Sequence, residues 1–116
     1  MLGSVAVTEV METPGKLVRD RIPEIIRSAG LDPIVTIATP EDYNRYLCAK
    51  LDEERLEYVN SGDVEELADL VEVCFAAAQA HGVSPDELLD LAQAKREQRG
   101  GFTGRLVWFG NAEPAR

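Results

Sequence analysis

The feature that most constrains the fold is the stretch "NSGD" at residues 60–63, which separates two long segments with helical periodicity. Asn, Ser, Gly and Asp favour turns, and Ser61 or Asp63 can cap the helix that follows. The apolar spacing on either side predicts one helix over 40–60 and another over 63–81. Because the turn between them is short, we expect the two helices to lie side by side and antiparallel.

Two shorter helices are expected to flank this hairpin. Residues 21–29 carry an isoleucine stripe, and "SPDE" at 84–87 has the Ser cap, first-position Pro and Glu of a capping box that opens a helix ending near Arg99. The β-prone residues at 34–38 and 105–109 predict short accessory strands. The sequence therefore predicts an all-α, four-helix bundle-like domain with two such strands.

The length of 116 residues fits one domain with a hydrophobic core that needs no metal or disulfide to hold it. Residues 1–15 lack periodicity and end in Pro-Gly, which favours a flexible lead-in. The folded domain is expected over 16–110, with a tail over 111–116. Cys48 and Cys74 lie in apolar helical runs without metal-ligand spacing, a pattern typical of reduced core cysteines.

The charge balance limits the class of partner. Lys and Arg total 12 against 21 Asp and Glu, a net charge of -9, which disfavours nucleic acid polymers and anionic membranes as partners. No apolar run approaches the roughly 18 residues that span a bilayer, and the start does not resemble a signal peptide, so we expect a cytoplasmic protein. An anionic ligand would need a local basic cluster or a divalent cation held by the acids.

Some carboxylates lie where a solvent-exposed face does not explain them. Glu54 falls in the middle of the apolar stripe of the helix over 40–60, and Glu57 lies at the edge of that stripe. Glu66 and Asp69 share a sector of the next helix. Facing residues of an antiparallel hairpin have a constant sum of residue numbers, and both the Glu57/Glu66 and the Glu54/Asp69 pairs satisfy it. The two rows of acids are therefore expected to meet across the hairpin.

Converging carboxylates repel one another and are costly to desolvate unless a positive charge lies among them. An all-oxygen site without His or Cys suits Mg²⁺, with Mn²⁺ as a substitute, rather than Zn²⁺. The alternative is that these acids are solvated groups on exposed faces. The residues alone leave both interpretations open.

The motif "EERLE" at 53–57 followed by "EELAD" at 65–69 resembles the EExxE…ExxD signature of the all-α nucleoside triphosphate pyrophosphohydrolase superfamily. The segments "KLVRDRIPEII" and "KREQRGGF" are similar to the ends of its MazG-like and phosphoribosyl-ATP pyrophosphohydrolase-like members. The resemblance covers about residues 16–103. Only eight residues separate Glu57 from Glu66, fewer than in many members.

The resemblance implies Mg²⁺-dependent hydrolysis of the α–β phosphoanhydride of a nucleotide to a monophosphate and pyrophosphate, as in the removal of non-standard nucleotides. It also implies a homodimer or homotetramer with the nucleotide site completed between subunits. By motif position, Glu53 and Glu54 correspond to catalytic acids. The metal ligands implied are Glu54, Glu57, Glu66 and Asp69.

Two basic clusters stand out in this acidic chain, and each offers donors suited to phosphate groups. For the second cluster, an equally open interpretation is that it complements a helix C-terminus. Phe102 is a candidate for stacking on a base. The candidate phosphate-binding residues are Lys16, Arg19, Arg21, Lys95, Arg96 and Arg99.

Two alternatives to a general nucleotide pyrophosphohydrolase remain from the sequence. One is an enzyme of the same chemistry with a phosphoribosyl-ATP-type substrate. The other is a non-catalytic helical module that keeps the fold for oligomerisation or regulation. The apolar character of the helix expected over 63–81 indicates that a partner covers some of its surface.

Overall fold

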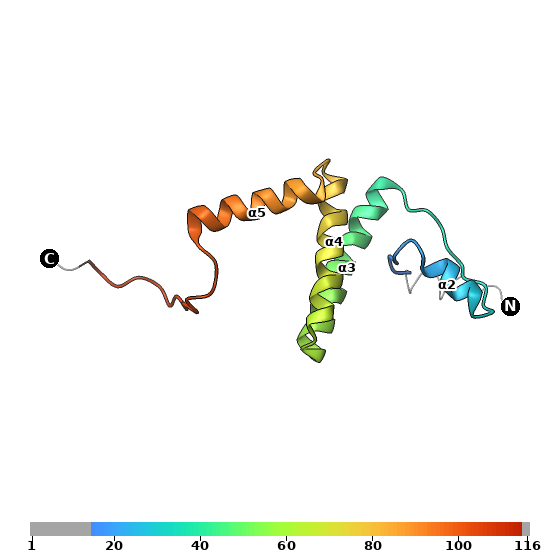
Figure 1. Cartoon of the computed structure of the whole chain (residues 1–116), viewed down its shortest axis with the longest axis horizontal. Coiled ribbons are helices and arrows are strands. Elements are labelled where there is room, and N and C mark those ends of the chain that lie inside the picture. Colours follow the sequence, from blue (N-terminus) through green and yellow to red (C-terminus); the bar gives the residue numbers. More distant parts are fainter. Residues whose placement is uncertain (1–14, 115–116) are drawn as a thin grey trace.

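The computed structural model describes residues 15–114, which form four α-helices (Figure 1). The predicted all-α class is confirmed, and each helix lies close to its predicted bounds. The lead-in over 1–15, apart from Gly15, falls outside the described residues, as does the end of the tail over 111–116. The helices are α2 (Ile22–Ser28), α3 (Pro40–Ser61), α4 (Val64–Ala80) and α5 (Pro85–Arg99).

Local chemistry sets the helix ends. The Thr39 hydroxyl accepts a hydrogen bond from the backbone N–H of Asp42 at 3.2 Å, with Pro40 at the first position of α3. Ser84 and Glu87 form the predicted capping box of α5. Gly62 ends α3 at a φ of 71°, a left-handed conformation that glycine adopts without a steric penalty.

The prediction of accessory strands is wrong. Neither 34–38 nor 105–109 forms a strand, and the two segments lie at opposite ends of the molecule (Figure 1). Ile34 and Ile37 are 95% and 99% exposed. β-Branched residues favour a strand only when a neighbouring strand completes the hydrogen-bond ladder, and neither segment has such a neighbour within residues 15–114.

The antiparallel hairpin of α3 and α4 is the main packed unit of the described chain (Figure 1). The helix α5 contacts α4 near their junction and then leads away from the hairpin. The molecule measures 76 × 31 × 30 Å with a radius of gyration of 20.2 Å. A compact domain of this length has a radius of about 13 Å. The single chain is therefore extended.

The hydrophobic core of one chain is smaller than its length predicts. The buried apolar residues in the described part are Leu47, Val73 and Ala78. Cys48 is exposed, so its expected core position is wrong, while Cys74 is half-buried. Because α5 does not fold back on the hairpin, apolar side chains of α3 and α4 stay in contact with solvent. They include Leu56, Val59, Val64, Leu67 and Val71.

No helix in the described range has both the length and the apolar composition that a bilayer crossing requires.

Candidate metal centre

Three of the four predicted metal ligands converge between α3 and α4. One carboxylate oxygen from each of Glu54, Glu66 and Asp69 lies within 4.8 Å of the other two. Glu66 and Asp69 share a face of α4 because they are three residues apart, and the turn at Gly62 brings that face opposite Glu54. The convergence follows from helix periodicity and the short turn.

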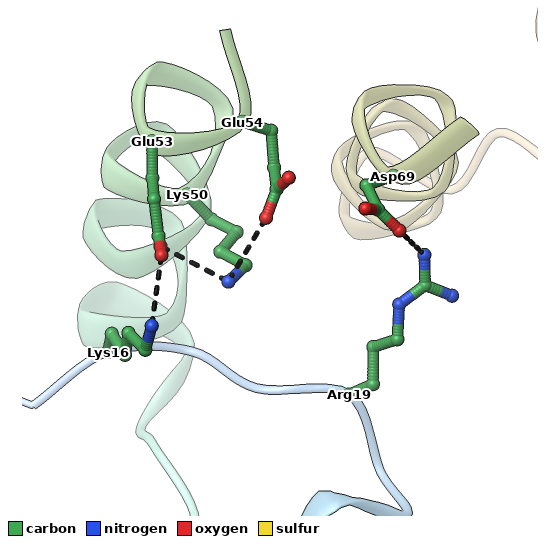
Figure 2. A network of polar contacts seen from close by, with 6 residues as sticks. All are labelled: Lys16, Arg19, Lys50, Glu53, Glu54 and Asp69. Atoms are coloured by element: carbon green, nitrogen blue, oxygen red, sulfur yellow. Dashed lines mark hydrogen bonds and ion pairs between the residues drawn. The ribbon is translucent and has the colours of Figure 1, made fainter. Parts of the chain in front are cut away.

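Within residues 15–114, Glu54 is the only charged residue that is buried, with 7% of its surface exposed. Burying a carboxylate is costly unless a partner compensates its charge. Figure 2 shows that Lys50, one turn earlier on α3, supplies that partner: its Nζ lies 3.3 Å from Glu54 Oε1 and 3.1 Å from Glu53 Oε2. The Lys50 side chain is itself only 15% exposed.

The segment before α2 passes beside the same acids and adds two more cations (Figure 2). Lys16 Nζ donates to Glu53 at 3.0 Å, and Arg19 donates to Asp69 at 2.6 Å. Both basic side chains are more than half exposed, so each ion pair is worth at most about 1 kcal/mol. These contacts bring Lys16 and Arg19, two of the three residues of the first predicted basic cluster, to the acidic site.

The ionisation of Glu53 and Lys50 reflects this pairing. Desolvation raises the pKa of Glu53, but hydrogen bonds from Lys16 and Lys50 outweigh it and hold that pKa below its usual value. Desolvation likewise lowers the pKa of Lys50, and the hydrogen bonds to Glu53 and Glu54 raise it overall. The carboxylate and ammonium forms are therefore reinforced at neutral pH.

Glu66 behaves differently because its neighbours are acids. Partial desolvation, followed by repulsion from Glu57, Asp69 and Glu54, raises the pKa of Glu66 above its usual value. Glu57 lies beside Glu66 but outside the converging group of three oxygens. A cation placed among these carboxylates would relieve the repulsion.

The other candidate phosphate and base contacts lie apart from this site in one chain. Arg21, directly before α2, forms an ion pair at 3.6 Å with Glu24 of α2. Phe102 follows α5 and is 97% exposed. The end of α5 points away from the α3–α4 hairpin (Figure 1), and it carries the second basic cluster, Lys95, Arg96 and Arg99.

Sequence reasoning did not identify Lys50 as a site residue. The signal was present, because Lys50 precedes Glu53 and Glu54 by three and four residues, the spacing at which helical side chains meet. A cavity of about 460 Å³ opens beside this group. Its lining includes Lys16, Arg19, Lys50, Glu54 and Asp69.

The donor set fits a hard divalent ion. All three converging donors are carboxylate oxygens, which Mg²⁺ and Mn²⁺ prefer, and the group contains no His or Cys for Zn²⁺. Oxygens at about 2.1 Å from an octahedral Mg²⁺ are about 3.0 Å apart when adjacent and about 4.2 Å apart when opposite, and three ligands include at least two adjacent pairs. The three oxygens lie within 4.8 Å of one another, so they would have to move closer together to bind one ion directly.

Comparison with known proteins finds a relative that matches part of this chain. A Mycolicibacterium smegmatis protein described as uncharacterized is 43% identical over 53 residues, which cover 46% of this chain and 53% of the relative. The chain thus spans about half the length of the curated relative it matches. No family model and no solved structure matches the chain.

Proposed function

We propose that this protein is a Mg²⁺-dependent nucleotide pyrophosphohydrolase, with Mn²⁺ as a substitute ion. It would cleave the α–β phosphoanhydride to a nucleoside monophosphate and pyrophosphate, acting on non-standard nucleotides in the cytoplasm. The observation that carries this proposal is the convergence of Glu54, Glu66 and Asp69, one of them buried, within 4.8 Å.

Glu54, Glu66 and Asp69 would hold the ion, with Glu57 as an adjacent fourth acid. When bound, Mg²⁺ supplies neutralisation of the phosphate charge and polarisation of phosphorus. Lys50 keeps the Glu54 carboxylate oriented through its 3.3 Å contact. Glu53, whose pKa is lowered, stays ionised and can accept a hydrogen bond from the attacking water.

The segment before α2 supplies donors for the substrate. Arg19 bridges to Asp69, and its guanidinium can instead give two parallel hydrogen bonds to phosphate oxygens. Lys16 also lines the cavity, and its Nζ contacts Glu53. Both cations are exposed enough to exchange a carboxylate partner for a phosphate group.

The active form is proposed to be a homodimer or homotetramer. The three apolar residues that are buried within 15–114 are too few to offset the conformational entropy of ordering that part of the chain. A second copy covering the exposed apolar faces of α3 and α4 would complete the core. Its Lys95, Arg96 and Arg99 would then be available to the acidic site of its neighbour.

The proposal is tested by incubating the full-length chain with a panel of canonical and non-standard nucleotides and Mg²⁺, and measuring pyrophosphate release. Glu54→Gln should abolish turnover, whereas Glu65→Gln, which changes an exposed acid of α4 outside the converging group, should not. Absence of turnover for every nucleotide would exclude the proposed pyrophosphohydrolase activity. Turnover preserved in Glu54→Gln would exclude this metal centre.

A phosphoribosyl-ATP-type substrate is a second candidate with the same chemistry, and adding that nucleotide to the panel tests it. The exposed apolar faces of α3 and α4 favour a third candidate, a non-catalytic oligomerisation module. That module would assemble without releasing pyrophosphate from any nucleotide.

A further inference from the structure

A second and larger cavity, of about 820 Å³, adjoins the one at the metal centre. Both cavities are lined by the segment 16–20 and by Tyr43, so they are neighbouring compartments that share a wall. The first compartment is lined by Lys50 and by two of the three converging acids, Glu54 and Asp69. The second is bounded by 34–39 and by Tyr46, and it lacks the three converging carboxylates.

The floor of this second compartment carries two aromatic rings. Tyr43 and Tyr46 are three residues apart on α3, and both are half-buried. Tyr43, Leu47, Lys50 and Glu54 follow one another at spacings of four, three and four residues, so they form a single stripe along α3. The ring of Tyr43 is therefore aligned with the buried metal ligand.

The facing wall is an extended segment whose backbone N–H and C=O groups make no hydrogen bonds to other backbone groups. Residues 34–38 form neither helix nor strand, and none of them takes part in a backbone–backbone hydrogen bond in the described range. Backbone N–H and C=O groups need partners whenever they leave water. Here they border a cavity that also contains tyrosine rings, and that combination can bind a planar group with hydrogen-bonding edges.

The spacing between the two compartments suits a nucleotide. Tyr43 and Glu54 are eleven positions apart, which corresponds to about 16 Å along the helix axis. Lys50 lies between them, and Lys16 and Arg19 line the shared wall. A ligand that reaches both compartments would have its anionic end at the cations and acids and its planar end at the tyrosines.

We propose that the 820 Å³ compartment binds the base and sugar of the nucleotide, with Tyr43 and Tyr46 contacting the base face and the backbone of 34–38 binding its edge. This inference rests on the proposed function, because it assigns the non-reacting half of the same substrate. It assigns the base contact to tyrosines of α3 in place of the earlier candidate Phe102, which is 97% exposed.

The test measures binding without turnover. Calorimetric titration uses full-length protein, Mg²⁺ and α,β-methylene analogues of ATP, GTP, CTP, UTP and the non-standard nucleotides of the turnover panel, none of which can be cleaved at the proposed bond. Tyr43→Leu and Tyr46→Leu should each weaken binding by about 10- to 100-fold, the usual effect of losing one stacking ring. Tyr58→Leu, on α3 but outside both cavities, should leave it unchanged. Mn²⁺ affinity should be the same in all three variants.

A measurement on the unmutated chain keeps the test independent of variant folding. The sequence contains three tyrosines, so a tyrosine-labelled sample gives three resolvable ring signals. The analogues should shift the signals of Tyr43 and Tyr46 and leave that of Tyr58 in place.

The outcomes separate the two proposals. Analogue binding that is absent, or equal in wild type and both tyrosine variants, overturns the base compartment even if the enzyme hydrolyses nucleotides. Weakened binding in the variants together with no hydrolysis by wild type supports the compartment and excludes the enzyme. Binding of an extended peptide at 34–38 that the analogues do not displace would also overturn the inference.

Discussion

Lys50 Nζ lies 3.3 Å from Oε1 of Glu54, and the two side chains are 15% and 9% exposed (Figure 2). A charged pair shielded to this degree depends on both partners, because removing one leaves the other charge unpaired and partly buried. The same contact orients the carboxylate that faces Glu66 and Asp69. We therefore expect this pair to affect both the stability of the chain and the proposed metal binding.

Replacing Lys50 by Met should lower the free energy of unfolding by about 3 kcal/mol at neutral pH, since it leaves the Glu54 carboxylate buried without its cation. Urea unfolding measures the change. The double variant Lys50→Met/Glu54→Gln should regain most of the loss. As a control, Arg55→Met breaks an exposed pair with Asp52 and should cost less than about 1 kcal/mol.

Adding Mg²⁺ or Mn²⁺ should raise the Tm of wild type, because a ligand that binds only the native state stabilises it by mass action. At a free ion concentration of 100 times Kd, the gain is about 2.7 kcal/mol. EDTA should reverse the shift. Glu54→Gln and Asp69→Asn should remove it, and Glu65→Gln should retain it. An equal shift in all variants would indicate nonspecific binding.

Arg19→Gln should change metal and nucleotide binding in opposite directions. Arg19 forms an ion pair with Asp69 at 2.6 Å and so competes with a metal ion for that carboxylate. Loss of the Arg19 cation should therefore tighten Mn²⁺ binding. The same change removes a phosphate donor and should raise the KM for nucleotide by about tenfold, the loss of one charge-assisted hydrogen bond. Parallel weakening of both would contradict the exchange of partners.

Glu66→Gln should stabilise the metal-free chain at neutral pH. The pKa of Glu66 is raised in the fold above its ordinary value of 4.5, so its favourable contribution is present below pH 4.5 and is lost as pH rises through the folded-state pKa. Glutamine removes the repulsive charge, and the advantage over wild type should vanish below pH 4.5. Urea unfolding in EDTA across this range measures it. An advantage that persists in acid would point to another cause.

Wild type should be a dimer or tetramer by light scattering, and Val71→Glu should lower both the mass and the Tm. Val71 is 46% exposed on α4 of the single chain, and a second copy covering it would bury the introduced charge. A monomer at every concentration, with an unchanged Tm in the variant, would contradict assembly through this face.

The sequence by itself determined the helices and the register of the acids. Both depend on neighbours within a few residues: Thr39 and Ser84 cap their own helices, and Glu66 and Asp69 share a face through their spacing. One short turn at Gly62 was enough to extend that local register across two helices.

Only the tertiary structure decided where segments that are far apart in the sequence lie and what they contact. It brought Lys16 and Arg19 to acids 37 and 50 residues away, left 34–38 without a strand partner, and directed α5 away from the hairpin. Side-chain periodicity fixes which residues share a helix face. It does not fix where an irregular connection leads, because that depends on packing and ion pairs formed only after the chain has folded.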